Sequence, residues 1–223
     1  MQRLCEFFEI KPGITALIGG GGKTSTMYAL AEELRKNGSV IVCTSTHILC
    51  PPQYPYLLRL SEKLALGEVV STGSIDCHKL STPEQSFDEM TRFADYVLVE
   101  ADGARQLPLK AHALYEPVIP KEANKVIVLI GIDGLGKTIK EAAHRPELYA
   151  AIVHAYIDTA ATPEMIRDVV NTYPRCDGIV INKADDQEAL EKALRLAMLF
   201  DVPVAITAWQ TENPIKAYRR KEV

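Results

Sequence analysis

The amino-acid sequence predicts an α/β protein that has a mostly parallel central sheet, helices on both faces and a P-loop NTPase-like organisation. Three observations predict this fold class. Short β-branched apolar runs alternate with amphipathic segments along all 223 residues, which is typical of βαβ units. The apolar runs are nearly continuous, as expected of strands that helices cover on both faces. A run of four glycines followed by Lys-Thr lies between the first apolar run and the first amphipathic segment.

Each element is expected where its local pattern is clearest. Strands are predicted over the apolar runs 14–18, 39–43, 68–71, 96–100, 125–130, 178–181 and 203–206. Helices are predicted over the segments with helical spacing of apolar residues, 24–37, 83–94, 146–157, 163–172 and 187–200. Gly38 supplies a stop for the first helix, and Pro146 and Pro163 suit first-turn positions.

The length and composition are those of one globular domain, expected to span residues 1–223 with long loops at about 44–60 and 102–124. Hydrophobic residues make up 47% and charged residues 24%, which excludes a disordered or fibrous chain. The net charge of −4 argues against a nucleic-acid partner. No apolar run approaches the roughly 18 residues of a membrane span, and the first residues do not form a secretory signal. We therefore expect a cytoplasmic protein with no membrane partner, and the pattern leaves a homodimer open.

The five cysteines form no Cys-x-x-Cys pair, and their odd number indicates reduced thiols. One cluster has the composition of a zinc site: His47, Cys50, Cys77 and His78. Buried thiols and solvated imidazoles would explain the same residues, so a metal role for this cluster stays open.

The run from Leu17 to Thr26 is the main candidate for a phosphate-binding loop. Glycines bring backbone N–H groups close to a polyphosphate because they carry no Cβ atom. Lys23 would reach the β- and γ-phosphates and the Thr24 hydroxyl would reach Mg²⁺, beside the positive end of the helix dipole. The strict pattern fails because position 17 is Leu, but Gly-x-x-Gly-Lys-Thr is present. A tight strand–helix turn is the alternative. The residues expected to contact phosphate are Gly19, Gly20, Gly21, Gly22, Lys23, Thr24 and Ser25.

A second run, from Gly131 to Thr138, fits the strict pattern Gly-x4-Gly-Lys-Thr better than the first run does. We interpret it as a decoy, because only seven residues separate Thr138 from Pro146 and the chain that follows is too short to supply a separate metal-binding strand. Gly131, Asp133 and Gly136 would border the site, since ligands collect where parallel strands end.

The strand predicted over 96–100 ends in an acid and leads into Ala-Asp-Gly. A rigid strand that delivers a carboxylate beside the phosphates suits a Mg²⁺ site, and residues two apart on a strand point the same way. Gly103 would donate its N–H to the γ-phosphate, and His47 would contact nucleotide or water. A strand-end acid that caps a turn and a structural histidine are the alternatives. The predicted metal-binding residues are Thr24, Glu100 and Asp102, and the predicted catalytic residues are Lys23, Glu100, Asp102 and His47.

The run Asn182-Lys183-Ala184-Asp185 follows a predicted strand and is similar to the Asn-Lys-x-Asp guanine-binding motif. The Asp185 carboxylate would accept both N–H groups of guanine, whereas adenine presents an acceptor at the matching position. The stem of Lys183 would cover the base, and Asn182 would link this loop to the phosphate loop. Ala208, after the next strand, resembles a second base-contacting loop. A strand end followed by an Asp N-cap is the alternative, and adenine or no strict preference stays open.

Five segments together carry a family resemblance: residues 19–25, 44–48, 99–111, 144–147 and 182–185. In this order they resemble the YqeC-like family, described as accessory proteins for selenium-dependent molybdenum hydroxylases or for selenium-cofactor biosynthesis. The resemblance spans nearly the whole chain, and the block Glu-Ala-Asp-Gly…Leu-Pro-Leu-Lys-Ala is its most specific piece. It implies a P-loop protein that uses Mg²⁺ and GTP, or ATP, in cofactor maturation, with a hydroxylase as partner protein.

The resemblance also implies a place for a second ligand. Arg105, Lys110, His144 and Arg145 would bind an anionic cofactor, such as a pterin phosphate, or a selenium species; solvated surface charges are the alternative. Two other functions fit the same phosphate loop. One is a small-molecule ligase or kinase, because the loop resembles the Gly-Thr-Asn-Gly-Lys-Thr loop of amide ligases, although those chains are longer. The other is a nucleotide-gated scaffold with negligible turnover.

Overall fold

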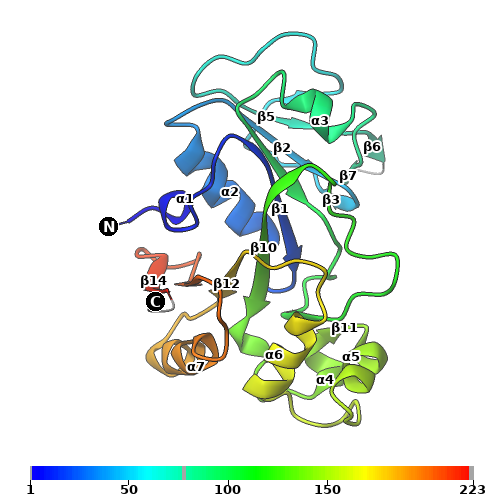
Figure 1. Cartoon of the computed structure of the whole chain (residues 1–223), viewed down its shortest axis with the longest axis vertical. Helices are drawn as coiled ribbons and strands as arrows, with labels where there is room; N and C mark the ends of the chain where they lie inside the picture. The colour runs from blue at the N-terminus through cyan, green and yellow to red at the C-terminus, as the bar shows by residue number, and fades with distance from the viewer. Residues whose placement is uncertain (1, 77–78, 221–223) are drawn as a thin grey trace. The chain divides into compact units, whose positions relative to one another are not determined.

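A computed structural model describes residues 2–76 and 79–220. It confirms the α/β class, with a mostly parallel central sheet and flanking helices (Figure 1). The internal contacts divide the chain into two compact units, each made of several segments. The first unit comprises Met1–Ile18, Thr24–Gly103 and Pro117–Val126, and the second comprises Gly19–Lys23, Ala104–Glu116 and Ile127–Val223. The expectation of one domain over the whole chain stays a prediction.

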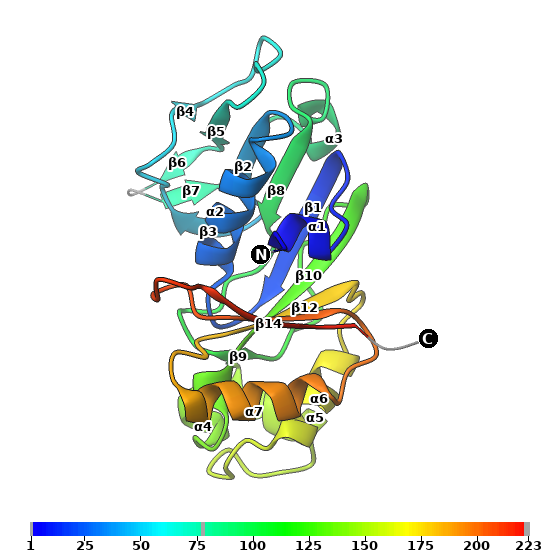
Figure 2. The ribbon, with the colours of Figure 1, turned by 90° about the vertical axis from the view of Figure 1, so that its left-hand side faces the viewer.

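The first unit contains five parallel strands in the order β1-β8-β2-β5-β4. Their bounds are Gly13–Gly19, Tyr96–Glu100, Val40–Thr44, Val69–Thr72 and Tyr56–Leu57. Every residue of β2 and β8 is buried, which explains their uninterrupted apolar sequences. Helix α2 (Lys23–Leu34) lies against one face of these strands in Figure 2. The unit also contains α1 (Leu4–Phe7), α3 (Phe87–Met90) and a small antiparallel sheet of β3 (His47–Leu49), β7 (Lys79–Ser81) and β6 (Ile75–Asp76).

The second unit contains the strand order β14-β13-β12-β10, in which β10 belongs to this unit from Ile127 onward. These strands span Ile215–Arg219, Val204–Thr207, Gly178–Asn182 and Ala123–Gly131, and only β14 runs antiparallel to its neighbour. Figures 1 and 2 both show α4 (Ile139–Ala142), α5 (Pro146–Ile152) and α6 (Pro163–Asn171) gathered together, with α7 (Gln187–Ala197) alongside α6. The short strands β9 (Leu109–Lys110) and β11 (Ala143–His144) pair in parallel, and a 3₁₀ turn, η1 (Ile132–Gly134), follows β10.

All seven predicted strands are present. All five predicted helices are shorter than expected, and the segments 83–94 and 146–157 differ most. The helix predicted over 146–157 ends at Ile152 because His154 takes a left-handed conformation, with φ 52°. The Ala155 N–H donates to the Ala150 carbonyl at 3.0 Å, which closes a Schellman-type end. Only Phe87–Met90 of the segment 83–94 is helical.

Tertiary contacts explain the late start of α3. The Gln85 side chain accepts a hydrogen bond from the Leu60 N–H and donates one to the Leu60 carbonyl. Ser86 then caps the helix, with Glu89 completing a capping box. The expected long loops at 44–60 and 102–124 also contain short strands: β3 and β4 lie in the first, and β9 lies in the second.

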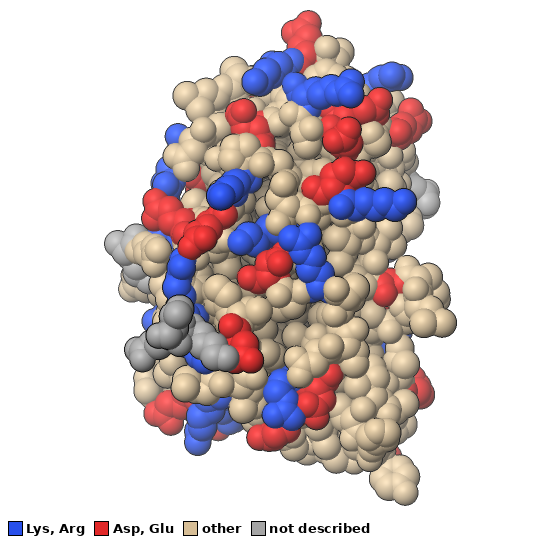
Figure 3. All heavy atoms as spheres, in the orientation of Figure 1, with Lys and Arg blue, Asp and Glu red and all other residues tan. Residues whose placement is uncertain are grey.

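Acidic and basic side chains are interspersed on the face drawn in Figure 3. This mixture agrees with a chain that has 25 Lys and Arg residues and 29 Asp and Glu residues. Among the described residues, no helix has both the length and the apolar character needed to span a membrane.

Candidate functional site

The four glycines after β1 adopt a conformation that other residues would resist. Gly21 and Gly22 have φ angles of 81° and 121°, in the region that side-chain-bearing residues rarely adopt. A Cβ atom on Gly21 would lie 2.2 Å from the Gly131 nitrogen, and one on Gly22 would lie 2.3 Å from the Asn182 Nδ2. Both the backbone angles and the neighbouring atoms therefore require glycine in this loop.

Two of the glycine N–H groups are used within the protein. The Gly20 N–H donates to the Leu129 carbonyl and the Gly21 N–H donates to the Leu107 carbonyl, each at 3.0 Å. The structure thus differs from the expectation that these two N–H groups point at a phosphate. In the first turn of α2 the first N–H groups have no acceptor within the helix, as in any α-helix.

Lys23 is the first residue of α2, and its side chain folds back over the glycine loop. Lys23 is 5% exposed, and its Nζ donates to the Gly19 carbonyl at 2.7 Å. The ammonium group is therefore held against the first glycine of the loop. Ser25, two residues after Lys23, is exposed.

In the first unit, the hydroxyl of Thr24 donates to Glu100 Oε2 at 2.8 Å. Glu100 is the last residue of β8 and is buried, with 6% of its surface exposed. Its position is fixed because its carbonyl accepts from the Thr44 hydroxyl at 2.7 Å and from the Ser45 N–H at 3.1 Å. The structure therefore brings the predicted Thr24 hydroxyl and the predicted Glu100 carboxylate together. The charge of Glu100 also affects a neighbour: burial, together with this negative charge, raises the pKa of Tyr28 on α2 to about 12.

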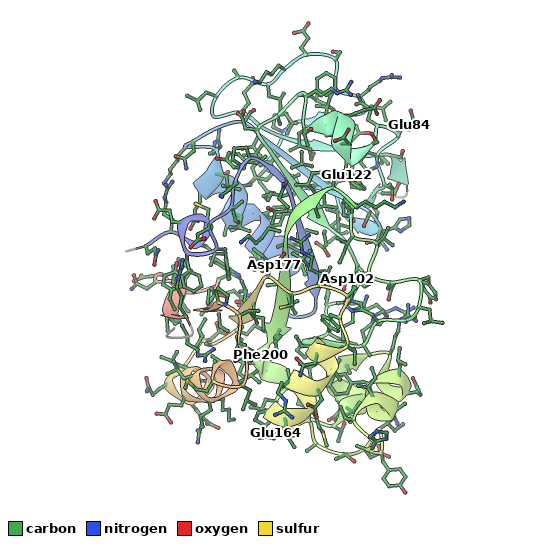
Figure 4. All side chains as sticks on the ribbon, in the orientation of Figure 1. Glu84, Asp102, Glu122, Glu164, Asp177 and Phe200 are labelled. Carbon is green, nitrogen blue, oxygen red and sulfur yellow. The ribbon has the colours of Figure 1, made fainter. Side chains whose placement is uncertain are left out.

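Asp102, labelled in Figure 4, lies two residues beyond Glu100 and is completely buried. The intervening Ala101 donates its N–H to the Leu17 carbonyl and accepts from the Val118 N–H, each at 2.9 Å, so the backbone on this side of Asp102 is well anchored. Gly103 has open space where a Cβ atom would stand. His47 lies on β3, opposite Ser81, and is exposed.

Asn182 links the base motif to the phosphate loop, as its sequence position predicted. Its Nδ2 donates to the Gly21 carbonyl at 2.8 Å, and its Oδ1 accepts from the Thr207 hydroxyl at 3.1 Å. Asn182 and Thr207 are both buried, at the ends of the neighbouring strands β12 and β13. One amide therefore joins the ends of two strands to the glycine loop.

We expect Asn182→Ala to lower the free energy of unfolding by about 1–3 kcal/mol, because it leaves a buried carbonyl and a buried hydroxyl without this partner. Urea unfolding measures the change. Asn213→Ala, at an exposed position, is the matched control and should change stability by less than about 0.5 kcal/mol. Equal effects of the two substitutions would contradict a structural link through Asn182.

The remaining residues predicted to contact the base, Lys183, Asp185 and Ala208, have different surroundings. Lys183 has a left-handed backbone, with φ 67°, and its Nζ donates to Asp133 Oδ2 at 2.9 Å. The Lys137 Nζ lies 3.7 Å from the same oxygen. Asp185 is exposed, so its carboxylate is open to a ligand. Ala208 is fully buried and its N–H already donates to the Pro214 carbonyl at 2.7 Å, so this N–H is used within the protein.

The second Gly-Lys-Thr run does not lead into a helix of useful length. Thr138 caps α4, which has four residues and a capping box with Glu141. Gly136 has φ 84°, and Gly131 at the end of β10 donates its N–H to the Pro108 carbonyl at 2.9 Å. A four-residue helix provides little of the aligned dipole that favours a phosphate.

Two further predicted clusters have different outcomes. Cys77 and His78 of the zinc hypothesis lie outside the described residues, and within the described residues no group of three His, Cys, Asp or Glu side chains is placed to bind a metal. Lys110 and Arg145 both contact Glu116. Glu116 could not be identified from the sequence, because it lies in an irregular segment without periodicity.

Comparison with known proteins gives three findings. The family model described as YqeC protein matches residues 15–147, more than half of the chain. The protein YqeC of Escherichia coli (strain K12) is 32% identical over 168 residues, which cover 69% of this chain and 63% of that protein. The signal recognition particle 54 kDa protein of Pyrobaculum aerophilum is 30% identical over 126 residues, covering 52% of this chain and 28% of that protein. The chain therefore spans less than two thirds of the length of both curated relatives.

Proposed function

Since this chain belongs to the YqeC family, we propose that it is a Mg²⁺-dependent protein that binds GTP in preference to ATP and hydrolyses it. We further propose that it acts as an accessory factor in the maturation of a selenium- or molybdenum-dependent hydroxylase cofactor. Family membership and the P-loop homology to the 54 kDa protein support nucleotide binding. The observation that carries the proposal is the 2.8 Å hydrogen bond from Asn182 to Gly21, because it joins a guanine-type motif to a phosphate-type loop.

The triphosphate would bind to the loop 19–25 and the first turn of α2. Lys23 is already held over the loop by the Gly19 carbonyl, so little rearrangement separates it from a phosphate oxygen. The positive end of the helix dipole favours the same place. The two glycine N–H groups that donate to Leu129 and Leu107 would serve to shape the loop.

Thr24 and Glu100 fit a Mg²⁺ ion. Both supply hard oxygen donors, and these lie 2.8 Å apart on a helix start and a strand end. Bound Mg²⁺ would neutralise charge that develops on the phosphates during transfer. Thr24 would be the ligand, Glu100 would orient the water around the ion, and Asp102 would face the attacking water or a second substrate. Thr24 directly follows Lys23 in the chain, so the metal residue and the phosphate residue are neighbours.

Guanine selectivity would come from Asp185. Its carboxylate is exposed and would accept from two N–H groups of guanine, a pair that adenine lacks. The ion pair with Asp133 holds the ammonium group of Lys183, so that its aliphatic stem would lie against the base. Asp133 is therefore proposed to position Lys183.

We expect Asp185→Asn to weaken GTP binding by roughly 10- to 100-fold and to reduce discrimination against ATP, since a hydrogen bond to a charged group contributes about 1.5–3 kcal/mol. Isothermal titration with GTP, GDP and ATP in the presence of Mg²⁺ measures this. Asp186→Asn is the matched control: this neighbouring exposed acid caps α7, and Asn caps helices equally well, so the change should alter neither stability nor purine preference appreciably. Equal affinity of the wild-type protein for GTP and ATP would contradict the guanine assignment.

A phosphotransferase or ligase is a second candidate function, favoured by the cations that surround Glu116. These groups would suit an anionic phosphoryl acceptor. The products distinguish the candidates, because hydrolysis alone yields free phosphate whereas a kinase yields a phosphorylated small molecule.

A further inference from the structure

Two consecutive hydroxyl side chains attach the end of β2 to other parts of the first unit. The Thr44 hydroxyl donates to the Glu100 carbonyl at 2.7 Å. The Ser45 hydroxyl donates to the Val118 carbonyl, also at 2.7 Å, and the Val118 N–H donates to the Ala101 carbonyl at 2.9 Å. Thr44 is completely buried and Ser45 is 8% exposed. The chain that leaves β2 is therefore bonded to the end of β8 at two consecutive residues.

The Thr44 hydroxyl also accepts a hydrogen bond. The Thr46 N–H donates to Thr44 Oγ1 at 3.0 Å, and the two threonine hydroxyl oxygens lie 3.3 Å apart. A hydroxyl that donates its proton can accept at the same oxygen, and in a buried place each of the two bonds strengthens the other. The Thr46 N–H, the Thr44 O–H and the Glu100 carbonyl thus form one cooperative chain of hydrogen bonds.

One end of this chain is the residue that carries the proposed metal-site carboxylate. Glu100 Oε2 accepts from the Thr24 hydroxyl at 2.8 Å, while the Glu100 carbonyl accepts from Thr44. The carboxylate and the carbonyl belong to a single residue at the end of β8. A reorientation of Glu100 at that strand end would therefore alter the contact with Thr24 and the contact with Thr44 together.

The other end of the chain is a segment with few restraints of its own. Thr46 is partly exposed, and the exposed His47 begins β3. Strand β3 has three residues and lies at the edge of its small sheet, where it pairs with β7. Segments with few backbone hydrogen bonds and exposed residues open at a low cost in free energy. Residues 45–47 are therefore the part of this network that can respond to a change at Glu100.

We propose that Thr44 is a positioning residue that couples the proposed Mg²⁺ site to residues 45–47, so that occupation of the site orders this segment. The inference rests on the proposed function, because Glu100 is assigned to a metal site only there. The coupling requires the hydroxyl group. Thr44→Val keeps the shape of the side chain and removes both hydrogen bonds, whereas Thr44→Ser keeps both.

The first test needs no nucleotide and measures amide hydrogen exchange at Thr46. Thr44→Val should speed this exchange about tenfold, because it removes the acceptor of the Thr46 N–H, and Thr44→Ser should change it less than about twofold. Thr72→Val is the matched control and should have no effect. Thr72 is also buried in the first unit, and its hydroxyl has no hydrogen-bond partner among the described residues.

A double-mutant cycle tests the coupling itself. Glu100→Ala removes the carboxylate that accepts from the Thr24 hydroxyl. Alone it should speed exchange at Thr46 about threefold, and in the Thr44→Val background it should have no further effect, because the connecting hydroxyl is already absent. Independent, additive effects of the two substitutions would overturn the coupling, whatever ligand the protein binds.

The second test adds Mg²⁺ and a non-hydrolysable GTP analogue. Exchange at Thr46 should slow in the wild-type protein and in Thr44→Ser, and should stay unchanged in Thr44→Val. In phosphate-release assays, Thr44→Val should raise the Mg²⁺ concentration for half-maximal release about tenfold, as expected of a group that supports a metal-site residue. A merely structural role of Thr44 would lower stability without moving this Mg²⁺ dependence.

The outcomes distinguish the coupling from the proposed function. Binding of the analogue to the wild-type protein without any change in exchange at Thr46 would overturn the coupling and leave the proposed function intact. If the wild-type protein does not bind the analogue, the proposed function is wrong, and a non-additive double-mutant cycle would still support the link from Glu100 through Thr44. A wild-type Mg²⁺ dependence in folded Thr44→Val would also overturn the positioning role.

Discussion

Lys23→Ala should abolish binding of nucleoside triphosphate, with a loss of about 100-fold or more in affinity, whereas Lys137→Ala should leave it nearly unchanged. A charge-assisted contact between a buried lysine and a phosphate is among the strongest that a loop provides. Lys23 is 5% exposed and is held over the glycine loop, but the Lys137 side chain is 51% exposed and lies near Asp133. Titration calorimetry with GTP and Mg²⁺ compares the two variants.

The two lysines form a matched pair, because each follows a glycine in a Gly-Lys-Thr run. Lys23→Met keeps most of the buried volume, so it separates the loss of charge from a packing defect. Thermal unfolding of each variant shows whether the fold is intact. Equal losses for Lys23 and Lys137 in folded protein would show that the phosphate loop has been assigned to the wrong run.

Glu100→Gln should lower the rate of phosphate release by about 10- to 100-fold while changing GTP affinity much less. Groups that orient a metal's surroundings typically contribute this factor, and the benefit of such a group is larger in the transition state than in the bound substrate. The substitution keeps the shape of the side chain and an oxygen that can accept from the Thr24 hydroxyl at the present 2.8 Å. Only the charge is removed, so a change in rate reports electrostatics.

Asp102→Asn should have a comparable effect on the rate, since this fully buried acid follows the same strand. Glu122→Gln is the control, at an exposed acid of the first unit. Phosphate release and GTP affinity are measured for all three at saturating Mg²⁺. Wild-type rates in both Glu100→Gln and Asp102→Asn would refute the assignment of β8 as the metal strand. No phosphate release from the wild-type protein would favour the nucleotide-gated scaffold.

The central strands and the position of the glycine loop could be predicted from local sequence alone. The strands β1, β2, β8, β10 and β12 are buried apolar runs, and burial on both faces requires that composition whatever their neighbours are. The link from Asn182 to Gly21 could also be predicted, because a residue at the end of one parallel strand lies near the loop after another.

Short elements depended on the tertiary structure. Strands β9 and β11 have two residues each, which is too few for a periodic pattern, and they exist because each supplies the other's hydrogen bonds. Strand β14 lies at the end of the strand order and all five of its residues are only partly buried, so its sequence IKAYR carries little apolar signal. Helix α5 stops at a left-handed histidine, which residue preferences do not predict.

The contacts of the site side chains likewise came only from the fold. No spacing in the sequence connects Lys110 and Arg145 to Glu116, or Lys183 to Asp133, because these partners meet through loops rather than through helical or strand periodicity. The sequence could name charged residues near a ligand, but the balance of their charges depends on which of them share a carboxylate. The net charge at such a place depends on the distances between the charged side chains, and only the folded chain sets those distances.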